Sequence, residues 1–404
     1  MKKCVKRGGK EICVSENGID NKNGKKNIYL LGGSSFFNDV GSEMITPILP
    51  FYINALGGGG VAIGLVSGLR EGLSSLLKLL GGWASDLNGK RLPFVFLGYF
   101  ISAIFKILLF FANTWQAVVA FVSLERFGKA RDAPRDAIIA VSTNNRGRGF
   151  GINQAMDKAG GIVGMIIVIL ILWKLNLEFK TIIIIAGFVS AISLIPLFFV
   201  KEPKIKIKGD KSLFSGIKHL DSRLKYFIFV SCIFTIANFG LQMFLLLMAK
   251  DITGSMLTAM ALFTLFYFTC AIFTIPFGSW SDRIGRKRVL GIGYGLFIFV
   301  GLGFVFLVDG ITSLILLFIA YGLVYAMTQS NQLALVSDLS GEHKGTALGF
   351  YQFMIGIVNI PAGLLAGYLW DISPKTMFIY ITIIGIFALI FLNSVKESKI
   401  RNRS

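Results

Sequence analysis

Long apolar stretches constrain this chain more than any other feature. Each of them is close to the roughly 20 residues that a helix needs to cross the hydrocarbon core of a bilayer. Only 16% of the 404 residues are charged, against about 25% in a typical soluble protein. The sequence therefore predicts an all-α integral membrane protein with twelve transmembrane helices, expected at 28–53, 61–83, 93–113, 115–138, 150–173, 181–200, 226–249, 256–279, 289–308, 312–334, 346–369 and 376–394.

One polar turn occurs twice, 196 residues apart. The first copy reads GWASDLNGKR and the second reads GSWSDRIGRKR, and each joins two apolar stretches. Similarity at nearly half the chain length indicates a duplication, which is a known plan of membrane transporters. The residues of the two turns that we expect to act as gating loops are Gly82, Asp86, Gly89, Lys90 and Arg91, and Gly278, Asp282, Arg283, Gly285, Arg286 and Lys287.

The duplication predicts two pseudo-repeated bundles of six helices each. We expect the first bundle at 27–200 and the second at 226–395, joined by a polar linker at 201–225. The remaining residues, 1–26 and 396–404, are expected to be polar cytoplasmic tails, the first of them disordered.

The distribution of basic residues predicts the orientation. The chain has a net charge of +19, and the segments expected in the cytoplasm hold 29 Lys and Arg against 4 in the outside loops. Basic residues accumulate on the cytoplasmic side of membrane proteins. Both termini are therefore expected in the cytoplasm of a multi-pass protein of the cell membrane. This pattern accounts for the positive charge, so no nucleic acid partner is expected.

The repeated turn resembles the signature loop of the major facilitator superfamily, which lies between helices 2 and 3 and again between helices 8 and 9. The first copy departs from the family pattern at Leu87, where a basic residue is usual. The stretch FNDVGSEMITPILP also resembles a poorly characterised prokaryotic branch of the family. The resemblance implies a monomeric secondary transporter that works by alternating access in the lipid bilayer.

Several other functions are disfavoured by the sequence. The two histidines, His219 and His343, fall in expected loops, and the four cysteines show no paired spacing. No catalytic dyad, metal site or cofactor site is therefore expected, and an enzyme is disfavoured. The G-x-x-x-x-G-K-[S/T] loop of ATP-driven proteins is also missing from the sequence. A non-transporting membrane sensor or scaffold stays open as an alternative.

Acidic residues inside apolar helices are candidates for proton coupling. Ionisable groups inside a membrane are costly and usually functional. Burial disfavours the charged form of a carboxyl group, so such a group can load and release a proton near neutral pH. The candidate carriers are Asp39, Glu43, Glu71 and Asp157.

Polar and basic residues within the helices are candidates for binding the substrate. The leading substrate class is a small organic solute, held in a polar cavity between the halves. An organic anion held by Arg70, Arg126 and Lys129 is the variant, and structural pairing of opposite charges is the alternative for every such residue. Residues 131–136 are expected to be solvated near the cytoplasmic surface. The full candidate set is Asn38, Arg70, Arg126, Lys129, Asn238, Gln242, Tyr325, Gln329 and Gln352.

Glycines spaced by four mark expected helix contacts. They occur at Gly64, Gly68 and Gly72 and again at Gly363 and Gly367. Small residues at this spacing let two helices approach closely. Such a contact is either fixed packing within one half or a sliding interface. The family resemblance favours the second, because helices 2, 5, 8 and 11 form its moving interface.

Overall fold

The computed structural model describes residues 24–85, 90–143, 148–175, 177–202, 220–341 and 346–395, together with the backbone of 2–7, 10–15, 21–23, 86–88, 146–147 and 344–345. Three expectations lie outside these residues: Gly89 and the side chain of Asp86 in the first gating loop, most of the linker at 203–219, and the tail at 396–404.

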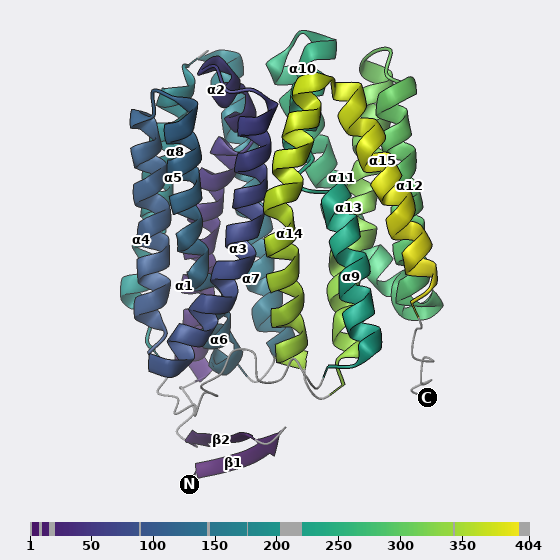
Figure 1. Ribbon diagram of the computed structural model, residues 1–404. Coiled ribbons are helices and arrows are strands. Elements are labelled where there is room, and N and C mark those ends of the chain that lie inside the picture. The colour runs from purple at the N-terminus through teal and green to yellow at the C-terminus, as the bar shows by residue number, and fades with distance from the viewer. Residues whose placement is uncertain are drawn as a thin grey trace. The chain divides into compact units, whose positions relative to one another are not determined.

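Within the described part of the chain, ten helical segments are long and apolar enough to cross a membrane (Figure 1). Each corresponds to one of the stretches expected from hydropathy. They are α3 Gly60–Asn88, α4 Leu92–Leu108 with η1 Leu109–Phe111, α7 Arg146–Lys174, α8 Phe179–Ile192 with η3 Pro196–Phe199, α9 Ser222–Ala237 with α10 Gln242–Thr253, α11 Met256–Ile284, α12 Arg286–Phe306, α13 Ile311–Leu339, α14 Lys344–Ile372 and α15 Pro374–Asn393.

The two other expected helices are interrupted. The stretch expected at 28–53 forms α1 Asn21–Ile45 and α2 Leu49–Ala55, because Pro47 between them cannot donate a backbone hydrogen bond. The stretch expected at 115–138 forms α5 Trp115–Arg126, η2 Phe127–Arg131 and α6 Asp132–Ser142. Its many charged residues also keep it from qualifying as an apolar span. The count of twelve spanning helices therefore stays a prediction.

The expectation of a disordered N-terminal tail differs from the structure. Strands β1 Lys2–Arg7 and β2 Lys10–Ser15 form an antiparallel hairpin, in which Lys2 pairs with Ser15 and Arg7 with Lys10. The β-branched residues Val5, Ile12 and Val14 favour this extended backbone. The polar composition of the tail pointed to disorder and gave no indication of this local preference for strands.

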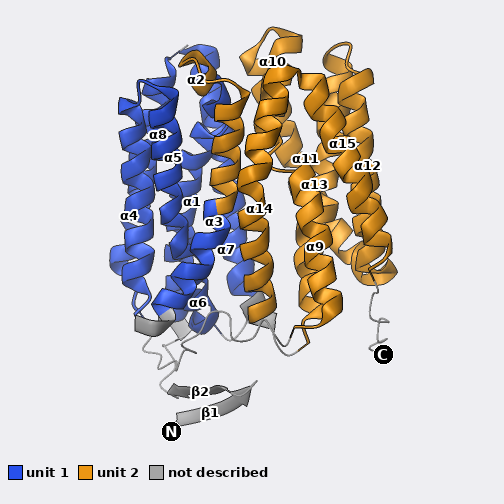
Figure 2. Ribbon diagram, viewed as in Figure 1, with its two compact units in different colours: residues 1–52, 73–213 blue, residues 53–72, 214–404 orange. Residues whose placement is uncertain are grey.

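The chain divides into two compact units (Figure 2). Residues 1–52 and 73–213 form the first unit, and residues 53–72 and 214–404 form the second. The first half of α3 thus groups with the C-terminal helices, whereas its second half groups with the N-terminal ones. The expected boundaries of the two six-helix bundles stay predictions.

Close backbone contact with α14 explains this grouping. A Cβ atom added at Gly64 would lie 2.0 Å from the carbonyl oxygen of Gly363, and one added at Gly363 would lie 2.3 Å from that of Gly64. Gly60 and Gly367 meet in the same way, at 2.5 and 2.2 Å. At the end of α14, the Asp371 carboxylate accepts hydrogen bonds from the backbone N–H of Gly60 and Val61, at 2.5 and 3.0 Å. The glycines expected to mark helix contacts lie in one, between α3 and α14, and the sliding of this contact stays a prediction.

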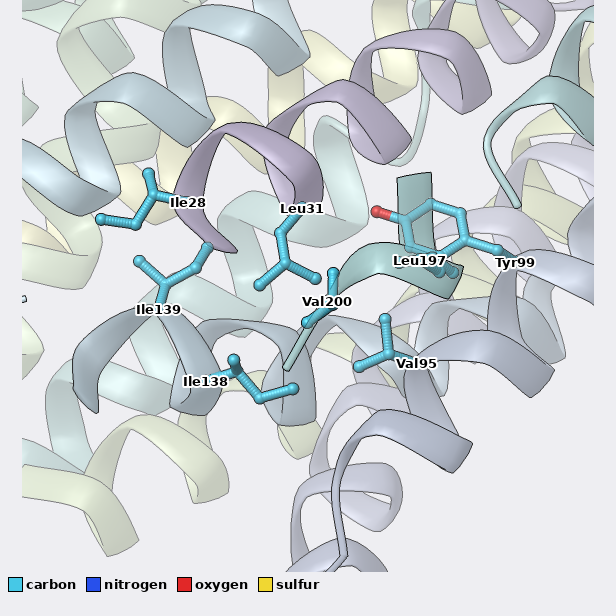
Figure 3. Close-up of a cluster of buried hydrophobic side chains, with 8 residues drawn as sticks. All are labelled: Ile28, Leu31, Val95, Tyr99, Ile138, Ile139, Leu197 and Val200. Carbon is cyan, nitrogen blue, oxygen red and sulfur yellow. The ribbon is translucent and has the colours of Figure 1, made fainter. Parts of the chain in front are cut away.

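A cluster of apolar side chains holds the start of α1 within the first unit. Asn27, just before the cluster, exchanges two hydrogen bonds with the backbone of Lys201, at 2.8 and 3.1 Å. Figure 3 shows the eight buried side chains, which come from α1, α4, α6 and the end of the η3 segment: Ile28, Leu31, Val95, Tyr99, Ile138, Ile139, Leu197 and Val200.

Large apolar side chains also cover the outside of the spanning helices. Phe198, Ile275 and Phe306 are exposed to 73%, 76% and 77%. Exposed apolar surface on this scale marks a protein or membrane contact. On helices of spanning length, it fits the hydrocarbon of a bilayer.

Candidate functional site

A buried ammonium group lies at the centre of the first unit. Lys106 of α4 is only 3% exposed, and its Nζ donates to the carbonyl oxygen and Oδ1 of Asn38, both at 3.1 Å. It also donates to Oγ of Ser190 at 2.9 Å. A buried charge requires such partners, because removal from water is costly. Lys106 is not among the candidates that the sequence singled out.

The carboxylate of Glu125 is the shared counter-ion of Lys106 and Arg126. Its Oε1 lies 3.9 Å from the Lys106 Nζ and accepts a hydrogen bond of 2.6 Å from Ser102. Glu125 also forms an ion pair with Arg126. Lys106 and Glu125 are both 3% exposed and Arg126 is 9% exposed. This pairing supports the structural alternative for Arg126.

A second cluster surrounds Arg135 of α6. Its Nη1 donates to Ser35 at 2.7 Å and lies 3.8 Å from the carboxylate of Asp157, while Nη2 lies 3.0 Å from that of Asp136. Asn153 donates to Asp157 at 3.2 Å, one turn along α7. Asp157, a candidate proton carrier, therefore has an arginine counter-ion from another helix.

The expectation that residues 131–136 are simply solvated is wrong for three of them. Arg131, Asp132 and Arg135 are 2%, 8% and 9% exposed. The Arg131 guanidinium lies 4.2 Å above the ring of Tyr99 and donates to the carbonyl oxygen of Gly128 at 2.8 Å. The tight 3-10 turn η2 packs on α4 and directs these charges inward, which a hydropathy pattern does not reveal.

The candidate acids Asp39 and Glu43 lie on α1, against α7. The helices touch through their backbones: Cβ atoms at Gly160 and Gly164 would lie 2.5 and 2.3 Å from carbonyl oxygens of α1. Asn38 donates to Asp39 at 3.4 Å, and Asp157 of α7 lies close enough to feel the charge of Asp39. Glu71 belongs to the second unit, so the first unit brings together three of the four candidate acids.

The second unit contains the neutral candidates. Asn238 accepts a hydrogen bond of 2.7 Å from the hydroxyl of Tyr321, whose ring lies 5.3 Å from that of Tyr325. Gln329 follows Tyr325 by one turn of α13 and is exposed, and Gln242 is the first residue of α10. The remaining candidates are half-buried and lie on separate elements, namely Arg70 on α3, Lys129 on η2 and Gln352 on α14.

A polar chain across three helices was missed by sequence reasoning. Gln332 of α13 donates to the hydroxyl of Tyr294 at 2.9 Å, and its Oε1 accepts from Tyr351 at 3.1 Å. The ring of Tyr294 stacks on that of Phe234 at 3.9 Å. An amide within a long apolar run was the available signal, but its partners come from distant parts of the sequence.

The second gating loop is a charged turn between α11 and α12. Arg286 pairs with Asp282 at 2.9 Å and with Asp338 at the end of α13. Gly285 has a φ of 104°, a conformation that favours glycine and accounts for the residue at this position. Ser281 donates to Asn331 at 2.6 Å.

Other residues of this loop have separate environments. Lys287 donates to the carbonyl oxygens of Asn393 and Val395, at 2.7 and 2.8 Å. Arg283 is exposed, and nothing lies near a Cβ placed at Gly278. The turn thus links α11, α12, α13 and the end of α15.

The first gating loop is held differently in its described part. The carboxylate of Glu202 accepts hydrogen bonds from the backbone N–H of Arg91 and Leu92, which begin α4. Lys90 is exposed, and a Cβ at Gly82 would lie 3.0 Å from Ala133 of α6. A carboxylate at a helix N-terminus satisfies its free N–H groups and complements its dipole.

In the part of the chain that the structure describes, no group of three His, Cys, Asp or Glu could hold a metal ion.

Comparisons with known proteins match this architecture. The family model described as the Major Facilitator Superfamily matches residues 31–254 and 227–403. An uncharacterised MFS-type transporter of Methanocaldococcus jannaschii is 45% identical over 387 residues, which cover 94% of this chain and 97% of that protein.

Solved structures share the fold. A mutant of the nucleoside transporter NupG has a TM-score of 0.81 at 16% identity, covering 91% of this chain and 99% of that one. A bacterial homologue of the human lysosomal transporter Spinster has a TM-score of 0.74 at 13% identity, covering 91% and 96%. The resemblance inferred from the repeated turn is confirmed. The chain belongs to the major facilitator superfamily and is a multi-pass transporter of the cell membrane from a poorly characterised prokaryotic branch.

Proposed function

We propose that this protein moves a small organic solute across the membrane by alternating access, coupled to protons. One observation carries the proposal: ionisable side chains of α4, α5, η2 and α6 are buried in the first unit, which also holds the half-buried acids of α1 and α7. Lys106 and Glu125 are both only 3% exposed. Intramembrane charges are costly and mark substrate or ion pathways. A sensor or scaffold does not require them, and the proposal includes no enzymatic step.

The proposed topology follows the sequence. All twelve expected stretches cross the bilayer, including those that the structure shows interrupted, as a monomer of two six-helix bundles with both termini in the cytoplasm. Broken helices are common in transporters, where the irregular backbone lines a binding site. The ratio of 29 to 4 basic residues supports the orientation.

Proton coupling is assigned to the acids of the first unit. Asp157 has a counter-ion in Arg135 at 3.8 Å, and Asp39 lies close enough to interact with it electrostatically. Neighbouring carboxylates resist joint ionisation, so these two acids are the proposed carriers of the proton. Glu43 lies one turn after Asp39 on α1, and Glu71 is a fourth candidate in the second unit.

The organic-anion variant has less support. It requires Arg126 to bind the substrate, but Arg126 already pairs with Glu125. Removing Arg126 from that pair breaks a buried ion pair, which is costly, and leaves Glu125 with Lys106 at 3.9 Å as its counter-ion. The amides and tyrosines of the second unit, among them Asn238 and Tyr325, suit a neutral or cationic solute better.

Flux measurements test the proposal. A thermal-shift screen of metabolites and drugs on the purified protein identifies a solute, and proteoliposomes then report its uptake with and without a pH gradient. Asp39→Asn, Glu43→Gln and Asp157→Asn are expected to reduce the gradient-driven component. Glu178→Gln, which changes an exposed acid just before α8, is the matched control. Full gradient-driven uptake with unchanged pH dependence in all three variants would exclude coupling by these acids.

A further inference from the structure

The helical segment 222–253 is unwound in its middle. It is long and apolar enough to cross a membrane as one segment, yet α9 ends at Ala237 and α10 begins only at Gln242. Gly240 adopts a φ of 61°, and its N–H donates to the carbonyl oxygen of Asn238 at 2.9 Å. Irregular backbone at membrane depth is tolerated only where protein buries it or where it lines a water-filled cavity. Such breaks are the usual substrate sites of transporters.

An acid of α3 faces this break. Ser67 donates to the carbonyl oxygen of Gly240 at 3.3 Å, which fixes one face of α3 against the break. Glu71 follows Ser67 by four residues and therefore lies on the same face, one turn further on. Its side chain is exposed, and among the described residues no hydrogen bond or ion pair involves it. Arg70 follows Ser67 by three residues and also lies on this side of α3, about 100° around the helix from Glu71.

A group of aromatic rings contacts the break through Asn238. The hydroxyl of Tyr321 donates to Asn238 at 2.7 Å. The ring of Tyr325 lies 5.3 Å from that of Tyr321, and Phe266 of α11 lies 5.1 and 5.2 Å from the two. Tyr325 is only half-buried. Glu71 lies close enough to Tyr321 and Tyr325 to interact with both electrostatically, which agrees with its position on the face that Ser67 defines.

We propose that Glu71, Tyr325 and Asn238 form a binding site for an organic cation, such as an amine or a quaternary ammonium or phosphonium ion. This inference rests on the proposed transport function and assigns its substrate class. The carboxylate supplies a negative charge that no described basic side chain pairs with. The face of an aromatic ring attracts a cation through its quadrupole, and the Asn238 carbonyl group adds a polar contact.

The charge at the candidate site favours a cation over an anion. In the first unit, Lys106 and Arg126 share the single carboxylate of Glu125, so that cluster keeps an excess of positive charge. The candidate site in the second unit has the opposite character, with an unmatched carboxylate beside aromatic rings. A site of this composition attracts positive charge and repels negative charge.

Equilibrium binding to the full-length protein in lipid nanodiscs tests the inference, with tetraphenylphosphonium as the probe and empty nanodiscs as the blank. Glu71→Gln is expected to weaken binding about tenfold, because a charge-assisted contact is lost. Tyr325→Leu is expected to weaken it about threefold to tenfold, whereas Tyr325→Phe, which keeps the ring, stays close to wild type. Glu178→Gln is the control for the loss of an exposed acid.

Several outcomes would overturn the inference. The inference is contradicted if the wild type does not bind tetraphenylphosphonium. It is also contradicted if a folded Glu71→Gln protein binds this cation as tightly as the wild type. The same holds if Glu71→Gln weakens the binding of tetraphenylborate, an anion of matched size, as much as it weakens the binding of the cation. If Glu71→Gln does not fold, the contrast between Tyr325→Leu and Tyr325→Phe decides. Uptake of a neutral or anionic solute without binding of the cation would leave the proposed transport intact and refute only this inference.

Discussion

Replacing Gly64 by alanine tests whether α3 is held by direct backbone contact with α14. An alanine Cβ would lie 2.0 Å from the carbonyl oxygen of Gly363, whereas ordinary van der Waals contact begins at 3.4 Å. The two backbones must therefore separate by about 1.4 Å, the difference between 3.4 and 2.0 Å. The neighbour is backbone, so it cannot rotate away as a flexible side chain would.

The expected magnitude follows from two opposing terms. Overpacking a well-packed contact costs about 1–3 kcal/mol. Alanine gains about 0.8–1.0 kcal/mol over glycine in a helix interior. The net effect of Gly64→Ala is therefore a loss of up to about 2 kcal/mol. Gly295→Ala is the matched control, because Gly295 is also helical but has nothing within 4 Å of an added Cβ. That variant is expected to gain up to about 1 kcal/mol.

Thermal unfolding of the three proteins in one detergent measures the effect. The account predicts that Gly64→Ala unfolds at a lower temperature than the wild type and that Gly295→Ala unfolds at the same or a higher one. Gly363→Ala should behave like Gly64→Ala, since its Cβ would lie 2.3 Å from the Gly64 carbonyl oxygen. Gly64→Ala unfolding at or above the temperature of Gly295→Ala would refute the backbone contact.

Three further substitutions separate the other contacts. Glu125→Gln should cost about 3–5 kcal/mol of unfolding free energy, because it leaves buried Lys106 with a broken pair; a melting temperature close to wild type would argue against the network. Asp371→Ala should lower the free energy of unfolding by about 0.5–2 kcal/mol, because it removes the cap of α3. Asp309→Ala, in an exposed loop, is the control and should lower it less in the same detergent. Arg286→Ala should change stability by less than about 1 kcal/mol, because its partner Asp338 is half-exposed, yet slow uptake in proteoliposomes; normal uptake would exclude a gating role.

Hydropathy predicted most of the spanning helices because a bilayer imposes a single length and composition on them. It failed to anticipate the interruptions at Pro47 and at residues 127–131. Both stretches are long enough to cross a bilayer. Their polar residues, however, make the local backbone depend on tertiary partners, which hydropathy does not report. Glycine spacing is a property of each helix by itself, so it indicated a close contact on α3 and on α14 but not that these two helices meet.

The candidate site was less predictable because a sequence does not say which charges meet. Arg126 was considered as a substrate ligand, and the structure pairs it with the adjacent Glu125. Arg131 was expected near solvent and is packed on Tyr99. The break at Gly240 was missed altogether, since the stretch around it reads as one continuous apolar span. Positive φ and long-range pairing come only from coordinates.

Distances between the two units under changing conditions test alternating access most directly. Spin labels at Leu175 and Asp309, which lie in one expected outside loop of each half, report this distance by double electron–electron resonance once the native cysteines are replaced. The account predicts two distance populations, whose ratio shifts when the pH or the concentration of a transported solute changes. A single distance distribution that stays the same under all of these conditions would contradict it.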